Sequence, residues 1–331
     1  MDRHSRISII VPVHTGGIHF DICLQSLAQM DSKPHEIIIV GDGDGDGSWK
    51  KGADYGFKAV RQETQGGPAK ARNFGANEAT GEWLLFLDAD VEASPKLISV
   101  AQKAIAHYPD TDAFIGSYDD SPGDKNFLSQ YRNLLHHFVH QEAGFEAFTF
   151  WGACGLIRKS DFEKVGGFDD ETYAIPSIED IELGYRLKKA GLKIRHQNDL
   201  LIKHWKRWTA VNMIRTDTFQ RAAPWTKLLL QTKGNHYELN LGLKYRIGLA
   251  CSCLMLPMPI VFIISPLLAL ILGSICVISY LSINFRFFHF LTNNKGIFFS
   301  VKSIFWRWIY DLCSGFGFLV GFARYISSSH K

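Results

Sequence analysis

The stretch Trp83-Leu-Leu-Phe-Leu-Asp-Ala-Asp90 joins a short apolar run to two carboxylates. Glu82–Leu87 has the length and composition of a buried β-strand, and Asp88 and Asp90 follow directly at its end. Carboxylates one residue apart can hold a hard divalent cation such as Mg²⁺ or Mn²⁺, although this spacing also occurs by chance in loops. The stretch therefore predicts a strand whose carboxyl end carries a metal or other polar ligand.

Strand and helix patterns alternate on both sides of this stretch. We expect strands at Ile7–Val13 and Glu36–Val40, and helices at Phe20–Met30 and Ala69–Ala79. Such alternation predicts an α/β fold with a mostly parallel sheet. Ligands of these sheets bind at the carboxyl ends of strands, where Asp42 also lies.

The loop after the second strand, Gly41-Asp-Gly-Asp-Gly-Asp-Gly-Ser48, resembles the start of an EF-hand calcium loop. However, loop position 12 is Ala53 and the preceding segment is a strand pattern rather than a helix. A calcium-regulated membrane protein stays an alternative. We favour a ligand site in which Asp42 makes the contact and Asp44 and Asp46 are solvated.

Composition narrows the class of protein. The 331 residues suffice for one large or two ordinary domains, and a net charge of +3 indicates no nucleic-acid partner. Six cysteines without a C-x-x-C pair predict buried thiols in a reducing compartment. No apolar leader precedes Ile7, so we expect no secretory signal and a catalytic domain in the cytoplasm.

The C-terminal third predicts a membrane region. Ile247–Phe285 carries no charge, and as one helix it would be about 58 Å long against a hydrocarbon core of roughly 30 Å. Pro266 near its midpoint favours a helical hairpin over 247–285, with basic residues on both flanks. A third span over 304–326 stays open, because Arg307 and Asp311 interrupt it. We therefore predict a soluble domain at 1–232, a membrane-associated region at 233–331, and a multi-pass protein of the inner or plasma membrane.

A second acidic motif lies in Ser177–Leu187. Glu179, Asp180 and Glu182 are favourable at a helix N-terminus, which is one interpretation of them. The other is a general base that takes a proton from an acceptor hydroxyl.

Several segments together resemble the family 2 glycosyltransferases. These are Ile9–Val13, Glu36–Asp42, Ala71-Arg-Asn-x-Gly75 with Ala79-x-Gly81, Phe86–Asp90, Gly166–Asp169 and Glu179–Leu183, in order over about 1–210. The resemblance implies a GT-A fold, a nucleotide-sugar donor, Mg²⁺ or Mn²⁺ as cofactor, and inversion at the anomeric carbon.

The resemblance also implies site roles. Pro12 and Val13 would border the nucleotide base, and Asp42 would contact it. Arg72 would lie near the diphosphate, and Asp88 and Asp90 would form the D-x-D pair. Asp180 would be the catalytic base, with Glu179 beside it. The family usually has two acids where this chain has Gly41-Asp42, which leaves one nucleotide contact in doubt.

The stretch His204-Trp-Lys-Arg-Trp208 stands where processive members carry Q-x-x-R-W, which speaks against processive synthesis. His204 could complete the metal site or be a hydrogen-bonding core residue. Tyr131–Glu142 lies where the family's acceptor side is, or is an amphipathic helix that packs on the core or the membrane.

The sequence thus predicts a membrane-bound inverting glycosyltransferase that acts on a lipid-linked or glycan acceptor. A non-catalytic nucleotide-sugar-binding membrane module is the alternative.

Overall fold

The computed structural model describes residues 5–43, 45–232 and 242–329, so Asp44 lies outside the described residues. The chain forms two compact units. Unit 1 comprises Met1–Lys125 and His140–Arg207, and unit 2 comprises Asn126–Val139 and Trp208–Lys331. The predicted division into a soluble domain at 1–232 and a membrane-associated region at 233–331 stays a prediction.

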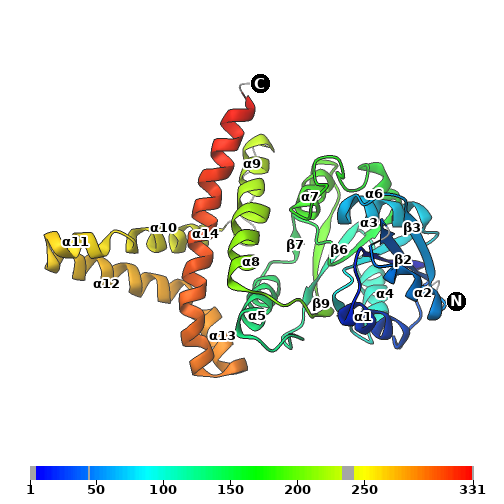
Figure 1. The fold of residues 1–331 in the computed structure, drawn as a ribbon, viewed down its shortest axis with the longest axis horizontal. Coiled ribbons are helices and arrows are strands. Elements are labelled where there is room, and N and C mark those ends of the chain that lie inside the picture. The colour runs from blue at the N-terminus through cyan, green and yellow to red at the C-terminus, as the bar shows by residue number, and fades with distance from the viewer. Residues whose placement is uncertain (1–4, 44, 233–241, 330–331) are drawn as a thin grey trace. The chain divides into compact units, whose positions relative to one another are not determined.

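Unit 1 alternates strands and helices, as the sequence predicted (Figure 1). Its elements are β1 (Ile7–Val13), α1 (Ile18–Ala28), β2 (Glu36–Asp42), the 3₁₀ helix η1 (Ser48–Lys50), α2 (Lys51–Asp54), β3 (Lys58–Gln62), α3 (Gly67–Glu78), β4 (Trp83–Leu87), β5 (Val91–Ala93), α4 (Leu97–His107), β6 (Ala113–Tyr118), β7 (Glu146–Ala147), β8 (Cys154–Arg158), α6 (Lys159–Lys164), α7 (Glu179–Lys189) and β9 (Ile194–His204).

The described strands form one nine-stranded sheet in the order β3-β2-β1-β4-β8-β6-β9-β5, with β7 paired to β9. The strands β3, β2, β1 and β4 are parallel, as predicted. The rest is mixed, because β8 runs antiparallel between β4 and β6, and β5 and β7 run antiparallel to β9. The expectation of a mostly parallel sheet is therefore wrong for the second half. The strand patterns on which it rested all lie in the first 90 residues.

The core of unit 1 explains why these segments become strands. Ile9, Ile38 and Leu85 lie on the three central parallel strands, and their side chains are fully buried. Strands buried on both faces need continuous apolar runs, which Ile7–Val13, Glu36–Val40 and Trp83–Leu87 supply. The polar residues that end these runs consequently lie together at one edge of the sheet.

Unit 2 is helical. Its elements are most of α5 (Phe127–Gln141), α8 (Ala210–Arg215), the π-helix η2 (Thr216–Ala222), α9 (Ala223–Thr232), α10 (Leu243–Met255), α11 (Met258–Ile264), α12 (Pro266–Ile283), α13 (Phe285–Lys295) and α14 (Ile297–Ser329). Tyr131–Glu142 thus falls largely within a helix, and Tyr131 and Leu134 pack in the core of unit 2.

The predicted hairpin is present as a helical arrangement. α10 and α11 pack alongside α12, and the chain reverses at Ser265 and Pro266 (Figure 1). Gly317 and Gly321 allow α14 to pack closely on η2 and α9, since a Cβ at either would collide with Ala222 or Ala223.

Within the described ranges, one helix is long and apolar enough to cross a membrane, namely Pro266–Ile283. The pair Leu243–Met255 and Met258–Ile264, bent by 47°, adds a second if it is counted as one span. The stretch 304–326 lies in α14, which is not among them. Buried Arg307 and Asp311 form an ion pair of 3.1 Å there.

Candidate active site

The carboxyl ends of β1, β2 and β4 bring several predicted residues to one edge of the sheet. Val13 is in register with Gly41 on the neighbouring parallel strand, and Asp88 directly follows β4. Pro12, Val13, Asp42 and Asp88 therefore lie at the same edge, where ligands of parallel sheets bind.

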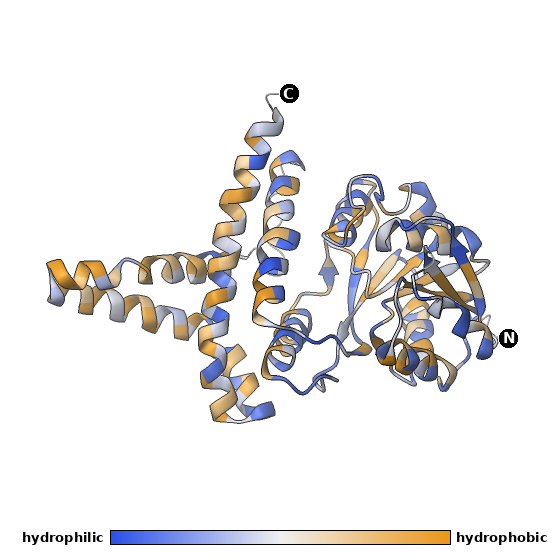
Figure 2. Cartoon of the chain, in the orientation of Figure 1, coloured by the Kyte–Doolittle hydropathy of each residue, from blue (hydrophilic) through white to orange (hydrophobic). Residues whose placement is uncertain are grey.

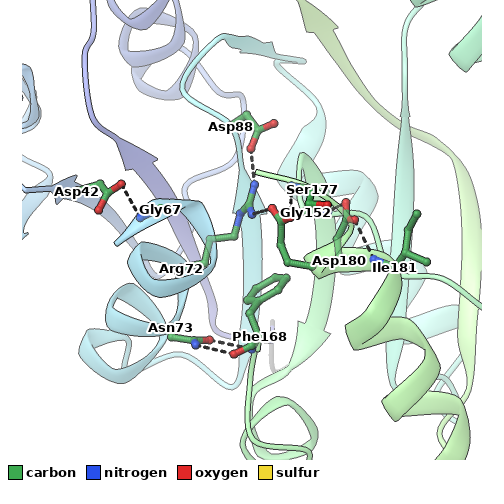
Figure 3. Close-up of polar contacts among 11 residues, drawn as sticks. Asp42, Gly67, Arg72, Asn73, Asp88, Gly152, Phe168, Ser177, Asp180 and Ile181 are labelled. Atoms are coloured by element: carbon green, nitrogen blue, oxygen red, sulfur yellow. Dashed lines mark hydrogen bonds and ion pairs between the residues drawn. The ribbon is translucent and has the colours of Figure 1, made fainter. Parts of the chain in front are cut away.

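Arg72 of α3 lies at the centre of this edge (Figure 3). Its guanidinium donates to Asp88 Oδ1 at 2.7 Å and to Glu179 Oε1 at 3.1 Å. The Arg72 side chain is 5% exposed, Glu179 is 8% exposed and Asp88 is 33% exposed. Burial alone lowers the pKa of Arg72, but Asp88, Glu179 and Asp180 outweigh it and raise that pKa above its ordinary value. Arg72 thus stays charged and joins the strand end to α7.

The chain packs closely around the Arg72 guanidinium. A Cβ at Gly152 would come within 2.9 Å of the guanidinium carbon, and that carbon lies 5.5 Å from the centre of the Phe168 ring. Asn73, the next residue of α3, donates to the Phe168 carbonyl at 2.8 Å and accepts from its N–H at 2.9 Å. The Ala-Arg-Asn motif therefore fixes α3 to the segment before α7.

Asp180 lies in the first turn of α7. Its Oδ2 accepts from the Gly152 N–H at 3.1 Å and its Oδ1 from the Ile181 N–H at 2.8 Å. Gly184 lets α7 pack directly on the Thr149 and Phe150 backbone, because a side chain there would collide with it. The helix N-terminus favours a negative charge at this place. Asp180 is therefore held as an oriented, partly exposed carboxylate beside Arg72.

Asp90 and His204 meet through the pairing of β5 with β9, in which Val91 is opposite His204. His204 Nε2 lies 3.5 Å from Asp90 Oδ2. Burial alone raises the pKa of Asp90, but the His204 imidazole and its hydrogen bond outweigh it and lower that pKa to about 2. The Tyr118 ring lies parallel to the imidazole, with ring centres 4.4 Å apart and planes 7° apart.

This pair is the part of the site that fits a divalent metal. The carboxylate oxygen suits Mg²⁺ or Mn²⁺, which it can share with phosphate oxygens, whereas the imidazole nitrogen beside it suits Mn²⁺ better than the harder Mg²⁺. Among the residues that the structure describes, no three histidine, cysteine, aspartate or glutamate side chains gather as a metal-binding group. The donor set therefore offers two ligands, and Asp88 is engaged by Arg72.

Asp42 makes several hydrogen bonds within the protein. Its side chain is buried, and its two oxygens accept hydrogen bonds from Gln62, from the Gly66 N–H at 2.7 Å and from the Gly67 N–H at 3.0 Å. Gly67 has φ +83°, a conformation that favours glycine. Asp42 thus holds the start of α3, and its contact with a nucleotide base stays a prediction.

Asp46 is not merely solvated. It accepts from the Ser48 N–H at 3.0 Å and from the Gly16 N–H at 3.1 Å, which joins the loops after β1 and β2. The hydrogen bonds from Ser48 lower the pKa of Asp46 to about 2. A strand rather than a helix precedes this loop, and η1 and the four-residue helix α2 follow it, so the helix that enters an EF-hand is absent from the described residues before it.

Sequence reasoning missed three contributors to the site: Gly152, Gln62 and Tyr118. Gly152 acts through its backbone N–H and its lack of a side chain, which no motif reports. Gln62 and Tyr118 each lie at the end of a strand, β3 and β6. That position is the one signal that could have indicated them.

Two family models match the chain. Residues 8–166 match glycosyl transferase family 2, and residues 132–215 match a model described as the N-terminal domain of galactosyltransferase. The glycosyltransferase GlyG of Streptococcus pneumoniae is 30% identical over 188 residues, which cover 50% of this chain and 62% of that protein. The N-acetylglucosaminyl-diphospho-decaprenol L-rhamnosyltransferase of Mycobacterium tuberculosis is 22% identical over 225 residues, which cover 56% of this chain and 71% of that protein.

Solved structures show the same fold. The mannosyltransferase PcManGT from Pyrobaculum calidifontis, in complex with GDP-Man and Mn²⁺, has a TM-score of 0.59 at 14% identity, over 96% of this chain and 88% of that one. GalNAc-T7 with UDP, GalNAc and Mn²⁺ has a TM-score of 0.52 at 16% identity, over 70% of this chain and 48% of that one. At these identities the likeness concerns the fold alone. The chain carries a glycosyl transferase family 2 domain over residues 8–166, and its α/β unit has the GT-A fold.

Proposed function

We propose that this protein is a membrane-attached, metal-dependent inverting glycosyltransferase. It would move a sugar from a nucleotide-sugar donor to a hydroxyl or phosphate group of an acceptor. The observation that carries the proposal is the buried Arg72, which joins the D-x-D strand end to the helix of Glu179 and Asp180. A binding module needs the donor edge of the sheet, but it has no need of an oriented carboxylate next to it.

The roles follow from the partners of each side chain. Asp90 and His204 would hold the metal, which supplies positive charge to the departing nucleoside diphosphate. Asp88 accepts a hydrogen bond from Arg72, so it would hold the Arg72 guanidinium in place. It would share the metal only if its side chain moved away from Arg72. Pro12 and Val13 at the end of β1 would border the base.

Asp180 would act as the general base. The acceptor hydroxyl gives its proton to the Asp180 carboxylate while its oxygen forms the new bond to the anomeric carbon. The bond from that carbon to the diphosphate breaks on the opposite face, which inverts the configuration. Gly152 and Ile181 fix the orientation of the carboxylate. Glu179 would keep Arg72 in place and would not touch the acceptor.

A lipid-linked acceptor in cell-envelope glycan or glycolipid synthesis is the substrate class that we propose. The Mycobacterium tuberculosis relative carries a diphospho-decaprenol acceptor in its name. Figure 2 shows that α11 and α12 consist largely of hydrophobic residues, and most of these residues are exposed. A lipid acceptor and an apolar anchor would place the reaction at the inner or plasma membrane, with unit 1 in the cytoplasm.

The test is a donor panel. The detergent-solubilised protein is incubated with several nucleotide sugars and Mn²⁺ or Mg²⁺, and released nucleoside diphosphate is measured with and without membrane lipid extract. We expect metal-dependent release from one donor that the extract raises. Asp90→Ala should abolish it, whereas Asp110→Ala, an exposed acid outside the site, should leave it unchanged. Donor binding by the folded protein without release from any donor would instead support a non-catalytic nucleotide-sugar-binding module.

A further inference from the structure

The tip of the α10–α12 hairpin is an exposed and almost entirely apolar segment of unit 2. We define the tip as Phe262–Leu268, in which Ser265 is the one polar residue. The Ile263 side chain is 83% exposed, Ile264 is 79% exposed and Leu267 is 70% exposed. Exposed apolar surface of this density marks a contact with a membrane or a partner.

The exposed charged side chains of residues 242–310, the segment that contains this hairpin, are all basic. No aspartate or glutamate occurs between residues 242 and 310. The exposed basic residues of this segment form what we call the collar: Lys244, Arg246, Arg286, Lys295 and Lys302. Basic residues next to an apolar insertion are attracted to anionic lipid headgroups. Charge complementarity therefore favours an anionic bilayer leaflet as the partner of this surface.

The part of the hairpin that extends beyond its contacts with α14 is short. Tyr280 of α12 donates to Asp311 of α14 at 3.1 Å, and Trp308 of α14 donates to the Ser252 carbonyl of α10 at 3.2 Å. These hydrogen bonds join both arms of the hairpin to α14. From Tyr280 to Pro266, α12 rises about 21 Å, which is less than the roughly 30 Å of a hydrocarbon core.

The tip has none of the features of a turn that emerges on the far side. Such turns carry charged residues or the tryptophan and tyrosine of the interfacial belt, and Phe262–Leu268 contains none. The backbone N–H and carbonyl groups of Ser265, at the turn, also have hydrogen-bond partners within the protein, so they do not need water. The Ser265 N–H donates to the Val261 carbonyl at 2.7 Å and its carbonyl accepts from Ala269 at 3.0 Å. Pro257, Pro259 and Pro266, which lie at the helix breaks, have no N–H to satisfy.

We infer that the hairpin enters an anionic leaflet from the collar side and turns back within the hydrocarbon, without crossing the bilayer. The collar stays at the headgroups and the tip ends inside the membrane. This arrangement replaces the two crossings predicted from the sequence. It rests on the membrane attachment in the proposed function, but not on the transferase reaction.

Cysteine accessibility tests the depth of the tip. Ser265→Cys and Lys302→Cys are each made in a Cys253→Ser background, because Cys253 is the exposed native cysteine and the other five are buried. A membrane-impermeant maleimide is applied to sealed right-side-out and inverted vesicles. We expect Lys302→Cys to react from one face only, and Ser265→Cys to react from neither face until detergent is added. Reaction of Ser265→Cys from the face opposite to Lys302→Cys would mean a crossing and would overturn the inference.

Reaction of both cysteines from the same face in sealed vesicles would also overturn it, since the tip would then lie in water. Neither result depends on transfer activity. Failure of this inference is therefore distinguishable from failure of the proposed function, which the donor panel tests in detergent.

Vesicle binding tests the collar. The purified protein should bind vesicles that contain phosphatidylglycerol more tightly than vesicles of phosphatidylcholine alone. Each exposed basic residue contributes roughly a fivefold effect near an anionic surface, so Lys295→Gln with Lys302→Gln should weaken binding about 25-fold. Arg324→Gln removes an exposed charge at the other end of α14 and should change binding little. Equal binding to both vesicle types would contradict the inference that the collar binds anionic headgroups. A loss of binding from Arg324→Gln as large as that from the collar variant would contradict it too.

Discussion

Replacing Arg72 by methionine should destabilise unit 1 strongly. The substitution keeps the unbranched stem of the side chain as far as the Nε position but leaves Glu179, which is 8% exposed, without its cation. Removing one partner of a buried ion pair costs roughly 3–5 kcal/mol. The pair with Asp88 adds little, because that carboxylate is 33% exposed and water screens it.

The expected loss of stability is measurable as a decrease in the melting temperature, Tm. A unit of this size shifts its Tm by roughly 2–4 °C per kcal/mol, so Arg72→Met should melt about 6–20 °C below the native protein. Thermal unfolding in detergent, followed by tryptophan fluorescence, measures the shift. Arg158→Met is a matched control, since its ion pair with Asp161 is partly exposed, at 39% and 16%.

A double-mutant cycle tests the assigned cause. Glu179→Gln in the Arg72→Met background removes the uncompensated charge, so the double variant should be more stable than the sum of the single changes by about 1–3 kcal/mol. A Tm for Arg72→Met within 2 °C of the native value, or additive losses in the cycle, would refute the reasoning that Arg72 neutralises Glu179.

Three further outcomes are expected. Burial lowers the pKa of His196 from 6.5 to about 4, so between these pH values the unfolded chain binds a proton that the folded chain does not. Stability should therefore fall as pH falls, by about 2 kcal/mol at pH 5, and chemical denaturation should show a flatter acid limb for His196→Gln. Asp90→Ala and His204→Ala should each weaken Mn²⁺ binding, measured by calorimetry in the presence of nucleoside diphosphate, and unchanged binding in both would exclude this pair as the ligands. Asp42→Asn places an amide opposite the Gly66 and Gly67 N–H groups, so it should cost about 1–3 kcal/mol of stability. A large rise in the donor KM at native stability would instead favour the predicted base contact.

The first ninety residues could be predicted well, because their strands are buried on both faces. β1 has the predicted bounds, and β2 and β4 differ from theirs by one or two residues. Runs such as Ile7–Val13 leave no other stable environment for that many apolar side chains. The placement of Asp88 and Asp42 at strand ends followed directly from these runs.

The partners of these acids could not be predicted, because they come from distant segments. Arg72 and Glu179 are 107 residues apart, and their contact depends on the packing of α7 on the backbone at Thr149 and Phe150. Asp90 meets His204 only because the three-residue strand β5 pairs with the end of β9. A strand of that length gives no periodic signal.

The central claim is that Asp180 removes a proton from the acceptor. The most direct test compares the native protein with Asp180→Asn, measuring sugar transfer and donor affinity in the same preparations. The asparagine keeps one oxygen, so it can accept one of the two hydrogen bonds from Gly152 and Ile181, but it cannot serve as a base. We expect a loss of transfer of at least about 100-fold with donor affinity unchanged. Transfer at near-native rate by Asp180→Asn would contradict it.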